Sequence, residues 1–344
     1  MIPRRVTDDP LTFNTMTPPR LTIGIPTLDR WEHLQDAIKE AMGQTLPARI
    51  IVADQGKCPE TKGVCDSWSD HPWFKRIDSP ATNLWENWRF VAEQAIEDGA
   101  EFFTWLQDDD YLNEYFSMRV CRAFDHYRDA NVYCSNLAMS YDNHLGFLHV
   151  RNWGPCVPVD VRRNRPTCYP GNLLVIAGYL HSWCMSPAKS FRVNDQFKRM
   201  LETLPAECDC LTERLDVAAC AMGNRFIVDP KPAGNWNIHD RNESQITGEK
   251  QPGQFAPAFA YLDAMMDQIP DWRNELAGWM SCLGGIGPNL LKTYYDHLRA
   301  HYRKSPYATQ IYEIIEGAIK AAGIKIEPEK EETPADVNGH LVTA

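Results

Sequence analysis

The sequence predicts an α/β protein with a mostly parallel sheet flanked by helices, followed by a helical region toward the C-terminal end. Two observations carry this prediction. Short, continuous apolar runs at 20–25, 50–53 and 102–106 have the composition of strands that are buried on both faces of a sheet. The segments between these runs show helical periodicity, so strands and helices alternate along the chain as they do in a doubly wound sheet.

The first strand is expected at 20–25, where a β-branched apolar run stops at Pro26. The first helix is expected at 31–42, because apolar residues recur there at i, i+3 and i+4 spacing. Asp29 is a candidate N-cap for this helix. The same spacing predicts that Trp31 faces the core.

A second strand at 50–53 and a helix at 84–98 lead to the third strand, 102–106, and Trp88 and Trp105 fit core positions in these elements. Polar residues follow each strand: Thr27 and Asp29, then Asp54, then Asp108, Asp109 and Asp110. Because the carboxyl ends of parallel strands meet at one edge of a sheet, where ligands bind, these side chains are expected to converge.

Composition divides the chain into a flexible arm (1–19), an α/β domain (20–250), a helical region (251–325) and a disordered tail (326–344). The later part of the α/β domain contains strand-like runs at 131–135, 146–150 and 226–228 and a helix at 207–223. Further helices are expected at 255–267, 273–282, 287–302 and 308–322. We expect the helical region to pack beside the sheet without adding a strand to it.

The net charge of −11 argues against a broad electrostatic grip on nucleic acid. A local basic cluster nevertheless occurs at Arg151, Arg162, Arg163 and Arg165. The N-terminus lacks the apolar core of a secretory signal, and no apolar run approaches the ~20 residues that span a bilayer. Eleven cysteines without a CxxC pair are typical of reduced thiols, which favours a cytoplasmic protein.

Three consecutive aspartates after a buried strand repel one another unless a positive charge compensates them. A hard divalent cation bound together with a diphosphate supplies that charge, since Mg²⁺ takes one or two carboxylates, waters and phosphate oxygens. The alternative is a solvated loop or the first turn of a helix, which acidic residues also favour. The position of Asp108, Asp109 and Asp110 at the end of an apolar strand favours the metal site.

Four segments in order resemble the family-2 glycosyltransferases: residues 21–30, residues 50–56, the pair Asn83 and Asn87, and residues 105–112. The resemblance extends over about residues 20–247 and implies a GT-A (Rossmann-like) domain at 20–250. It also implies a nucleoside diphosphate sugar donor, a UDP-sugar first, and Mn²⁺ or Mg²⁺ as cofactor.

By this resemblance, the nucleotide-sugar site comprises Pro26, Thr27, Asp29, Arg30, Asp54, Asn83, Asn87, Asp108 and Asp109. The implied metal ligands are Asp108, Asp110 and His239, with Asp109 as an alternative to Asp110. Leu28 replaces an aromatic residue of the family pattern, and Gln107 stands where many members have the first aspartate. These two departures leave the register of the metal motif and the choice of nucleotide open.

An inverting transferase needs a general base that takes the proton of the acceptor hydroxyl. The family places this carboxylate at a helix start about 100 residues after the metal motif, which points to Glu213 first and Asp216 second. Glu207 and Asp209 compete for the role. A solvated helix face with a Glu213–Arg214 pair is the alternative interpretation.

Two other functions remain open. A nucleotidyltransferase would normally show a Gly-rich phosphate loop near the first strand, and a non-catalytic nucleotide-sugar-binding protein would not need the acidic residues at 207–216. The acceptor is a saccharide, a lipid carrier, a protein or a modified nucleic acid such as hydroxymethylated DNA, which the arginine cluster would contact. Trp153, Trp183 and Trp236 are candidates for stacking on sugar rings. The oligomeric state is not predicted.

Overall fold

The computed structural model describes residues 18–141, 165–179, 189–204, 209–238, 256–278, 306–321 and 323. Its strands are β1 (Leu21–Thr27), β2 (Arg49–Asp54), β3 (Phe74–Asp78), β4 (Phe102–Trp105), β5 (Tyr111–Leu112), β6 (Ala130–Tyr141), β7 (Thr167–Pro170), β8 (Lys189–Arg192) and β9 (Arg225–Ile238). They form one nine-stranded sheet in the order β3-β2-β1-β4-β8-β6-β9-β5, and β7 pairs with β9.

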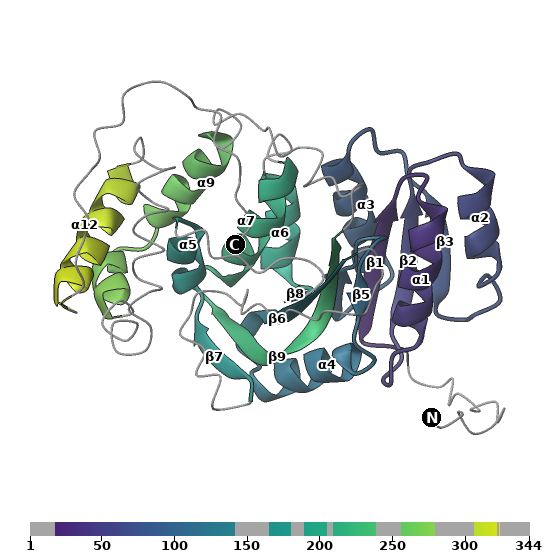
Figure 1. The fold of residues 1–344 in the computed structure, drawn as a ribbon, viewed down its shortest axis with the longest axis horizontal. Coiled ribbons are helices and arrows are strands. Elements are labelled where there is room, and N and C mark those ends of the chain that lie inside the picture. Colours follow the sequence, from purple (N-terminus) through teal and green to yellow (C-terminus); the bar gives the residue numbers. More distant parts are fainter. Residues whose placement is uncertain are drawn as a thin grey trace.

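The described helices are α1 (Trp31–Met42), α2 (Pro59–Asp66), α3 (Leu84–Glu97), α4 (Phe116–His126), α5 (Asn172–Tyr179), α6 (Asp195–Thr203), α7 (Asp209–Ala221), α9 (Ala256–Met266) and α12 (Pro306–Ala321). They cover both faces of the sheet (Figure 1). This is the α/β architecture that the alternating apolar runs predict.

Two hydrophobic cores lie on the two faces of the sheet, because successive strand residues point to opposite sides. Ile50 and Val52 face a core that α1 and α4 cover, whereas Ile51 and Ala53 face a core built with α3, α6 and α7. All four residues are fully buried. This burial confirms the prediction that the second strand is covered on both faces.

The N-terminal half of the sheet is parallel, since β1 pairs in parallel with β2 and β4, and β2 with β3. The predicted strands and helices of this half are confirmed. α2 and β3 were not predicted from the sequence. β3 is an edge strand with the sequence FKRID, and its half-buried Lys75 and Arg76 hide the apolar signal.

The C-terminal half of the sheet is mixed. β8 is antiparallel to β4 and β6, while β6 runs parallel to β9. The predicted strand at 226–228 is only the start of β9, which continues to Ile238. Pro230 and Pro232 interrupt the strand pattern there, and the register shifts on either side of Asn136 in the partner β6.

The C-terminal helices α9 and α12 pack into the same hydrophobic core as α3, α6 and α7. Leu262 of α9 and Ile311, Ile315 and Ile319 of α12 are fully buried in it. α9 and α12 lie at the end of the molecule opposite to α1 and α2 (Figure 1). The part of 251–325 that the structure describes contains helices and no strand, whereas the expected helix at 287–302 and the tail lie outside the described residues. A domain boundary near residue 250 stays a proposal.

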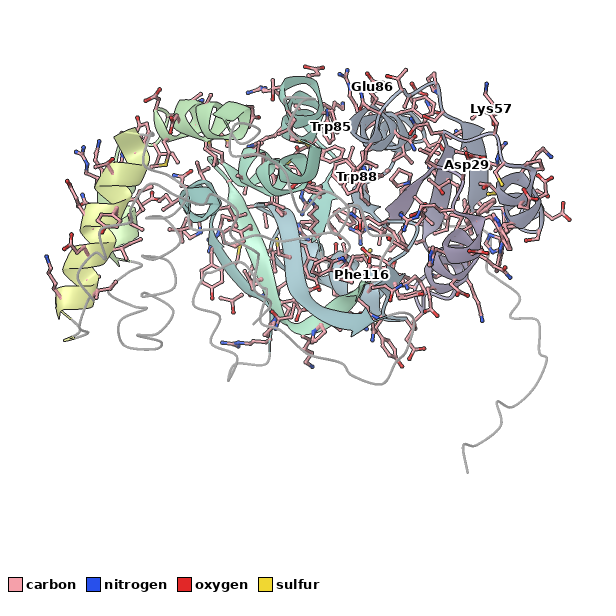
Figure 2. All side chains as sticks on the ribbon, turned by 45° about the horizontal axis from the view of Figure 1, so that its top comes forward. Asp29, Lys57, Trp85, Glu86, Trp88 and Phe116 are labelled. Atoms are coloured by element: carbon pink, nitrogen blue, oxygen red, sulfur yellow. The ribbon has the colours of Figure 1, made fainter. Side chains whose placement is uncertain are left out.

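The tryptophans differ in their placement. Trp88 and Trp105 are buried, and their rings stack with centroids 5.5 Å apart, as a core position requires. In Figure 2, Trp88 lies toward the interior and Glu86, on the other side of α3, lies at the surface. The core prediction for Trp31 is wrong: this residue is 37% exposed, because it begins α1 and the buried stripe starts at Leu34. Within the described residues, no helix is long and apolar enough to cross a membrane.

Candidate functional site

The carboxyl ends of β1, β2 and β4 meet at one edge of the sheet. Thr27 lies opposite Asp54 in the β1–β2 register, and Gly24 lies opposite Trp105 in the β1–β4 register. Three residues beyond Trp105, Asp108 therefore comes level with Thr27. The Thr27 hydroxyl donates a hydrogen bond of 2.7 Å to Asp108 Oδ2, and both side chains are buried.

Arg30 joins this edge from the turn between β1 and α1. Its Nη1 donates to Asp108 Oδ1 at 2.9 Å, and its Nη2 donates to Asp109 Oδ2 at 2.5 Å. The arginine side chain is 31% exposed, whereas those of the two aspartates are 5% and 4% exposed. One guanidinium therefore donates charge-assisted hydrogen bonds to two nearly buried carboxylates. The structure thus brings together Thr27, Arg30, Asp108 and Asp109.

Burial dominates the electrostatics of this cluster. Loss of hydration raises the pKa of Asp108 to about 7, although Arg30 opposes the shift, and Asp109 adds to it. Burial by itself lowers the pKa of Arg30, but the charges of Asp108 and Asp109 outweigh it, so that the arginine pKa is raised. The site is therefore built around negative charge in a poorly hydrated position.

Asp110 points elsewhere. Its side chain is fully buried, and its Oδ1 accepts a hydrogen bond of 3.0 Å from the backbone N–H of Asn237 in β9. The next residue, Tyr111 in β5, pairs with Asn235 in β9. Asp110 therefore fastens the aspartate run to the end of β9, two residues before His239. His239 itself lies outside the described residues.

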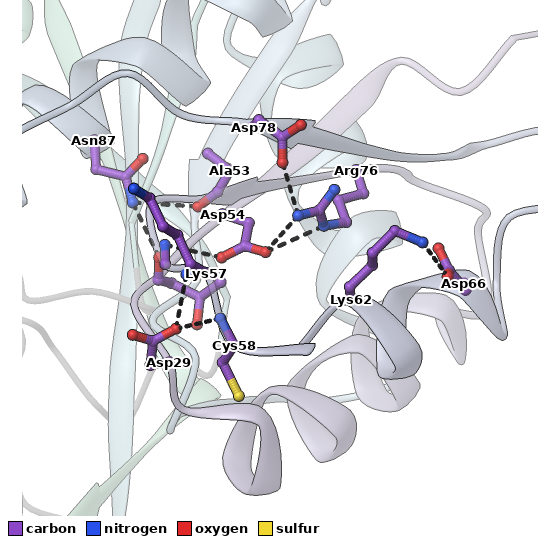
Figure 3. A network of polar contacts seen from close by, with 12 residues as sticks. Asp29, Ala53, Asp54, Lys57, Cys58, Lys62, Asp66, Arg76, Asp78 and Asn87 are labelled. Carbon is purple, nitrogen blue, oxygen red and sulfur yellow. Dashed lines mark hydrogen bonds and ion pairs between the residues drawn. The ribbon is translucent and has the colours of Figure 1, made fainter. Parts of the chain in front are cut away.

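Asp29 connects two loops of the site. Its Oδ1 accepts hydrogen bonds from the backbone N–H groups of Lys57 (3.1 Å) and Cys58 (2.9 Å), where α2 begins (Figure 3). Asp29 has a φ of +51°, a left-handed conformation that aspartate tolerates better than most residues. The expected role as N-cap of α1 is wrong, because Arg30 occupies that position without a side-chain cap.

Gly56 lies very close to the Asp29 side chain. A Cβ at this position would lie 2.0 Å from Asp29 Oδ1, so no other residue fits without movement. The Gly56 N–H donates to Asp54 Oδ1 at 3.0 Å. The other carboxylate oxygen of Asp54 accepts two hydrogen bonds from Arg76, at 3.1 and 2.7 Å (Figure 3). Arg76 also forms an ion pair with Asp78.

The two predicted asparagines lie on α3. Asn83 is the N-cap, and its Oδ1 accepts from Glu86 N at 2.9 Å. Asn87 is buried, and its Nδ2 donates to the carbonyl oxygens of Ala53 (3.2 Å) and Thr27 (3.4 Å). Asn87 thereby holds the ends of β1 and β2 together (Figure 3). Pro26, in β1, is buried and contributes backbone to the same edge.

Three of the candidate bases, Asp209, Glu213 and Asp216, belong to α7. The Asp216 side chain is 1% exposed, and its Oδ2 forms an ion pair of 2.6 Å with Lys189 in β8. A carboxylate held in this way is shielded from an acceptor hydroxyl, so its geometry favours a structural role. Asp209 begins α7, but its side chain and that of Glu213 lie outside the described residues, as does Glu207.

The remaining sequence candidates are only partly placed. Trp236 is half-buried in β9. Arg165 is exposed just before β7. Trp153, Trp183, Arg151, Arg162 and Arg163 lie outside the described residues.

The carboxylates fit a divalent cation as oxygen ligands. No three His, Cys, Asp or Glu side chains within the described residues are grouped to hold a metal by themselves. Asp108 and Asp109 nevertheless converge on one cationic group, and Mg²⁺ is commonly held by one or two carboxylates together with waters and phosphate oxygens. The residues present therefore suit a cation that is completed by a bound diphosphate.

Two charged residues of this region were not identified from the sequence. Arg76 lies on β3, which was not predicted, opposite Val52 near the end of β2. Had β3 been recognised as a strand, its pairing with β2 would have placed Arg76 close to Asp54. Lys189 forms its ion pair with a residue 27 positions later in the chain. No local sequence pattern identifies that partner.

Comparison with known proteins agrees with this geometry. The family model described as Glycosyl transferase family 2 matches residues 22–181. This range includes the turn that carries Arg30, the end of β2 and the aspartate run. No curated protein matches the chain.

Three solved structures match this chain over most of its length. The crystal structure of Staphylococcus aureus TarS 1–349 has a TM-score of 0.50 at 13% identity, and its complex with UDP-GlcNAc has a TM-score of 0.52 at 12% identity; each alignment covers 88% of this chain and 90% of TarS 1–349. A mannosyltransferase from Pyrobaculum calidifontis, in complex with GDP-Man and Mn²⁺, has a TM-score of 0.43 at 13% identity, with 90% and 87% of the two chains covered. Residues 22–181 of the chain therefore match a glycosyltransferase family 2 domain, and the chain shares the fold of TarS 1–349.

Proposed function

We propose that this enzyme transfers a sugar from a nucleoside diphosphate sugar to an acceptor hydroxyl with the help of a divalent cation. The observation that carries the proposal is the convergence of Thr27, Arg30, Asp108 and Asp109 at the carboxyl end of the parallel strands. Ligands of open α/β sheets bind at this edge. The cluster combines carboxylates for a cation with a guanidinium that suits phosphate.

A UDP-sugar is the first donor to test, because TarS, which has a similar fold, is solved in complex with UDP-GlcNAc. In this proposal Asp54 contacts the base, and its ion pair with Arg76 fixes the carboxylate in place. Asp29 and Asn87 act mainly by holding the loops and strand ends that form the nucleotide site.

Asp108 and either Asp109 or Asp110, with His239, are the proposed ligands of Mn²⁺ or Mg²⁺. When bound, such a cation stabilises the negative charge that develops on the departing diphosphate. Thr27 keeps one oxygen of Asp108 oriented, and Arg30 neutralises the carboxylates when the cation is absent. The hydrogen bond from Asn237 to Asp110 supports His239 as a ligand, because it brings the end of β9 to the aspartates.

The proposed stereochemistry is inversion, with a carboxylate from residues 207–216 as the general base. Glu213 is the first candidate, and Glu207 and Asp209 follow. Asp216 would have to leave its buried ion pair with Lys189 before it accepted a proton. A base must come within hydrogen-bond distance of the hydroxyl that it deprotonates.

The acceptor is proposed only as a hydroxyl compound: a saccharide, a lipid carrier, a protein, or hydroxymethylated DNA. The exposed Arg165 belongs to the arginine cluster that would meet a phosphate-bearing acceptor. A cytoplasmic location is proposed from the cysteines, since Cys58, Cys65, Cys121, Cys134, Cys168 and Cys220 are free thiols, as a reducing compartment keeps them.

A panel of nucleotide sugars tests the proposed function. We expect UDP or another nucleoside diphosphate to raise the melting temperature much more with Mn²⁺ or Mg²⁺ than with EDTA, because a bound ligand stabilises the folded state. Slow release of free sugar from the matching donor should accompany this effect. Equal stabilisation in EDTA would remove the cation from the proposal, and nucleotide binding without any sugar release would favour a non-catalytic protein.

A further inference from the structure

Arg30 already holds the position that a cation bound to Asp108 and Asp109 would use. Asp108 Oδ1 accepts from Arg30 and Asp108 Oδ2 accepts from Thr27, so both oxygens of this carboxylate are engaged. Asp109 Oδ2 accepts from the same guanidinium. A cation that binds Asp108 and Asp109 must therefore take at least part of the place of Arg30.

Displacement of Arg30 is unfavourable when no anion is present. The cation and the guanidinium are both positive, and like charges a few ångströms apart in a poorly hydrated site repel one another. The guanidinium would also lose its hydrogen bonds to two carboxylates while two-thirds of its side chain stays covered. A divalent cation alone is therefore expected to bind weakly.

A diphosphate changes this balance. It brings negative oxygens to the same edge of the sheet, and a guanidinium binds phosphate oxygens in the same bidentate way as carboxylate oxygens. Arg30 is the N-cap residue before α1, and its side chain is 31% exposed, so the side chain is not enclosed on all sides and has room to turn away from the aspartates. The displaced Arg30 guanidinium can therefore bind the diphosphate when the diphosphate and the cation enter the site together.

We propose that Arg30 is a built-in counter-ion that the metal displaces only when a nucleoside diphosphate arrives to receive it, so that metal and nucleotide bind as a coupled pair. This inference rests on the proposed function. It adds a specific device: the enzyme keeps its metal ligands neutralised by its own side chain and takes up the metal together with the donor. Such coupling is reciprocal, since each ligand must strengthen the binding of the other by the same factor.

Titration calorimetry and Mn²⁺ electron paramagnetic resonance test the proposal without any turnover. Mn²⁺ affinity is measured with and without UDP for the wild type, Arg30→Gln and Arg30→Lys. In the wild type we expect UDP to strengthen Mn²⁺ binding by about 5- to 150-fold, the usual range for coupled sites. Arg30→Gln should bind Mn²⁺ alone more tightly and show a smaller coupling factor. Arg30→Lys, which keeps the charge, should retain part of the coupling.

Arg89→Gln is the matched control. It removes the same charge from α3, where Arg89 pairs with Glu93 at the surface, and it should leave Mn²⁺ affinity unchanged. As a second readout, Mn²⁺ alone should raise the melting temperature of Arg30→Gln more than that of the wild type, since the metal then compensates carboxylates that lack their arginine. Circular dichroism confirms that each variant is folded.

The two ways of failing are distinct. If the wild type and Arg30→Gln bind Mn²⁺ and UDP with the same coupling factor, the counter-ion role is wrong and the proposed function stands. If the wild type binds no nucleoside diphosphate at all, the proposed function is wrong and the inference falls with it. Tighter Mn²⁺ binding in both Arg30→Gln and Arg89→Gln would show a general charge effect and would also overturn the proposal.

Discussion

Lys189 Nζ donates to Asp216 Oδ2 across 2.6 Å, and both side chains are essentially inaccessible to solvent. The pair joins β8 to α7, beside the buried hydrogen bond between the hydroxyls of Thr104 and Ser190. Because β8 is antiparallel to β4, the pair lies near the strand end that leads to Asp108. It therefore fixes the helix that carries the candidate base relative to β4, the strand that leads to Asp108.

Removal of one partner of this pair should destabilise the fold, because the other charge stays buried without compensation. Lys189→Met or Asp216→Asn should each lower the free energy of unfolding by about 3–5 kcal/mol, measured by urea denaturation. The double variant Lys189→Met/Asp216→Leu should recover most of the loss. If Asp216→Asn keeps full stability but loses turnover, Asp216 is the base and its structural role is wrong.

Substitutions of Asp109 and Asp110 should have different effects, the first on nucleotide binding and the second on the stability of the fold. Asp109→Asn removes a carboxylate that faces Arg30, so the Mn²⁺-dependent part of nucleotide binding should fall while the melting temperature changes little. Asp110→Ala leaves the Asn237 N–H without its acceptor, which should cost about 1–3 kcal/mol in the free energy of unfolding. Thermal shifts with Mn²⁺ and with EDTA measure both effects, and an equal loss of stability in the two variants would contradict this division.

Gly56→Ala tests the contact between the β1 and β2 loops. The added Cβ would lie 2.0 Å from Asp29 Oδ1, so the hydrogen bonds that Asp29 accepts from the backbone N–H groups before α2 must break or shift. We expect weaker nucleotide binding and a lower melting temperature. Gly63→Ala is the control, since no atom lies within 4 Å of a Cβ there. Wild-type nucleotide affinity in Gly56→Ala would show that this loop contact is dispensable.

The N-terminal half of the fold was predictable from the sequence because its strands are buried on both faces, which produces continuous apolar runs. The edge strand β3 gives no such run, and Pro230 and Pro232 mask the length of β9. The position of β8 between β4 and β6 depends on pairing between distant segments. Local patterns carry no information about that pairing.

The site was predictable where it depends on strand ends and not where it depends on loops. Thr27 and Asp108 follow from the register of β1 and β4. The contact of Asp29 with the loop before α2 depends on a left-handed turn, and the burial of the Asp216 charge depends on Lys189 from another strand. Such tertiary partners determine whether a carboxylate is available for chemistry.

The raised pKa of Asp108 predicts how metal-free stability depends on pH. A carboxyl group whose pKa rises from its usual value near 4 to about 7 on folding binds more protons in the folded state between those values. Its contribution to stability is therefore lost as the pH rises from ~4 to ~7 and levels off above that. Asp108→Asn lacks this group.

In EDTA, the difference in free energy of unfolding between Asp108→Asn and the wild type should consequently shift in favour of the variant over this pH range. The largest slope is about 1.4 kcal/mol per pH unit. Urea denaturation at pH 5, 6, 7 and 8 measures it. A difference that does not vary with pH would mean that Arg30 keeps Asp108 ionised throughout the range.

The assignment of the general base is tested by Glu213→Gln. Glu213 lies in the first turns of α7, one turn before the buried Asp216, which fixes the helix through Lys189. The variant keeps the size of the side chain and loses its basicity, so it should leave Mn²⁺-dependent nucleotide binding nearly unchanged and reduce turnover by about 10²–10⁴. Glu202→Gln, an exposed position on α6, is the control and should turn over normally. If Glu213→Gln also turns over normally, the corresponding variants of Glu207 and Asp209 are tested next. Normal turnover in all three would exclude a general base at these three positions and would make a retaining mechanism the better interpretation.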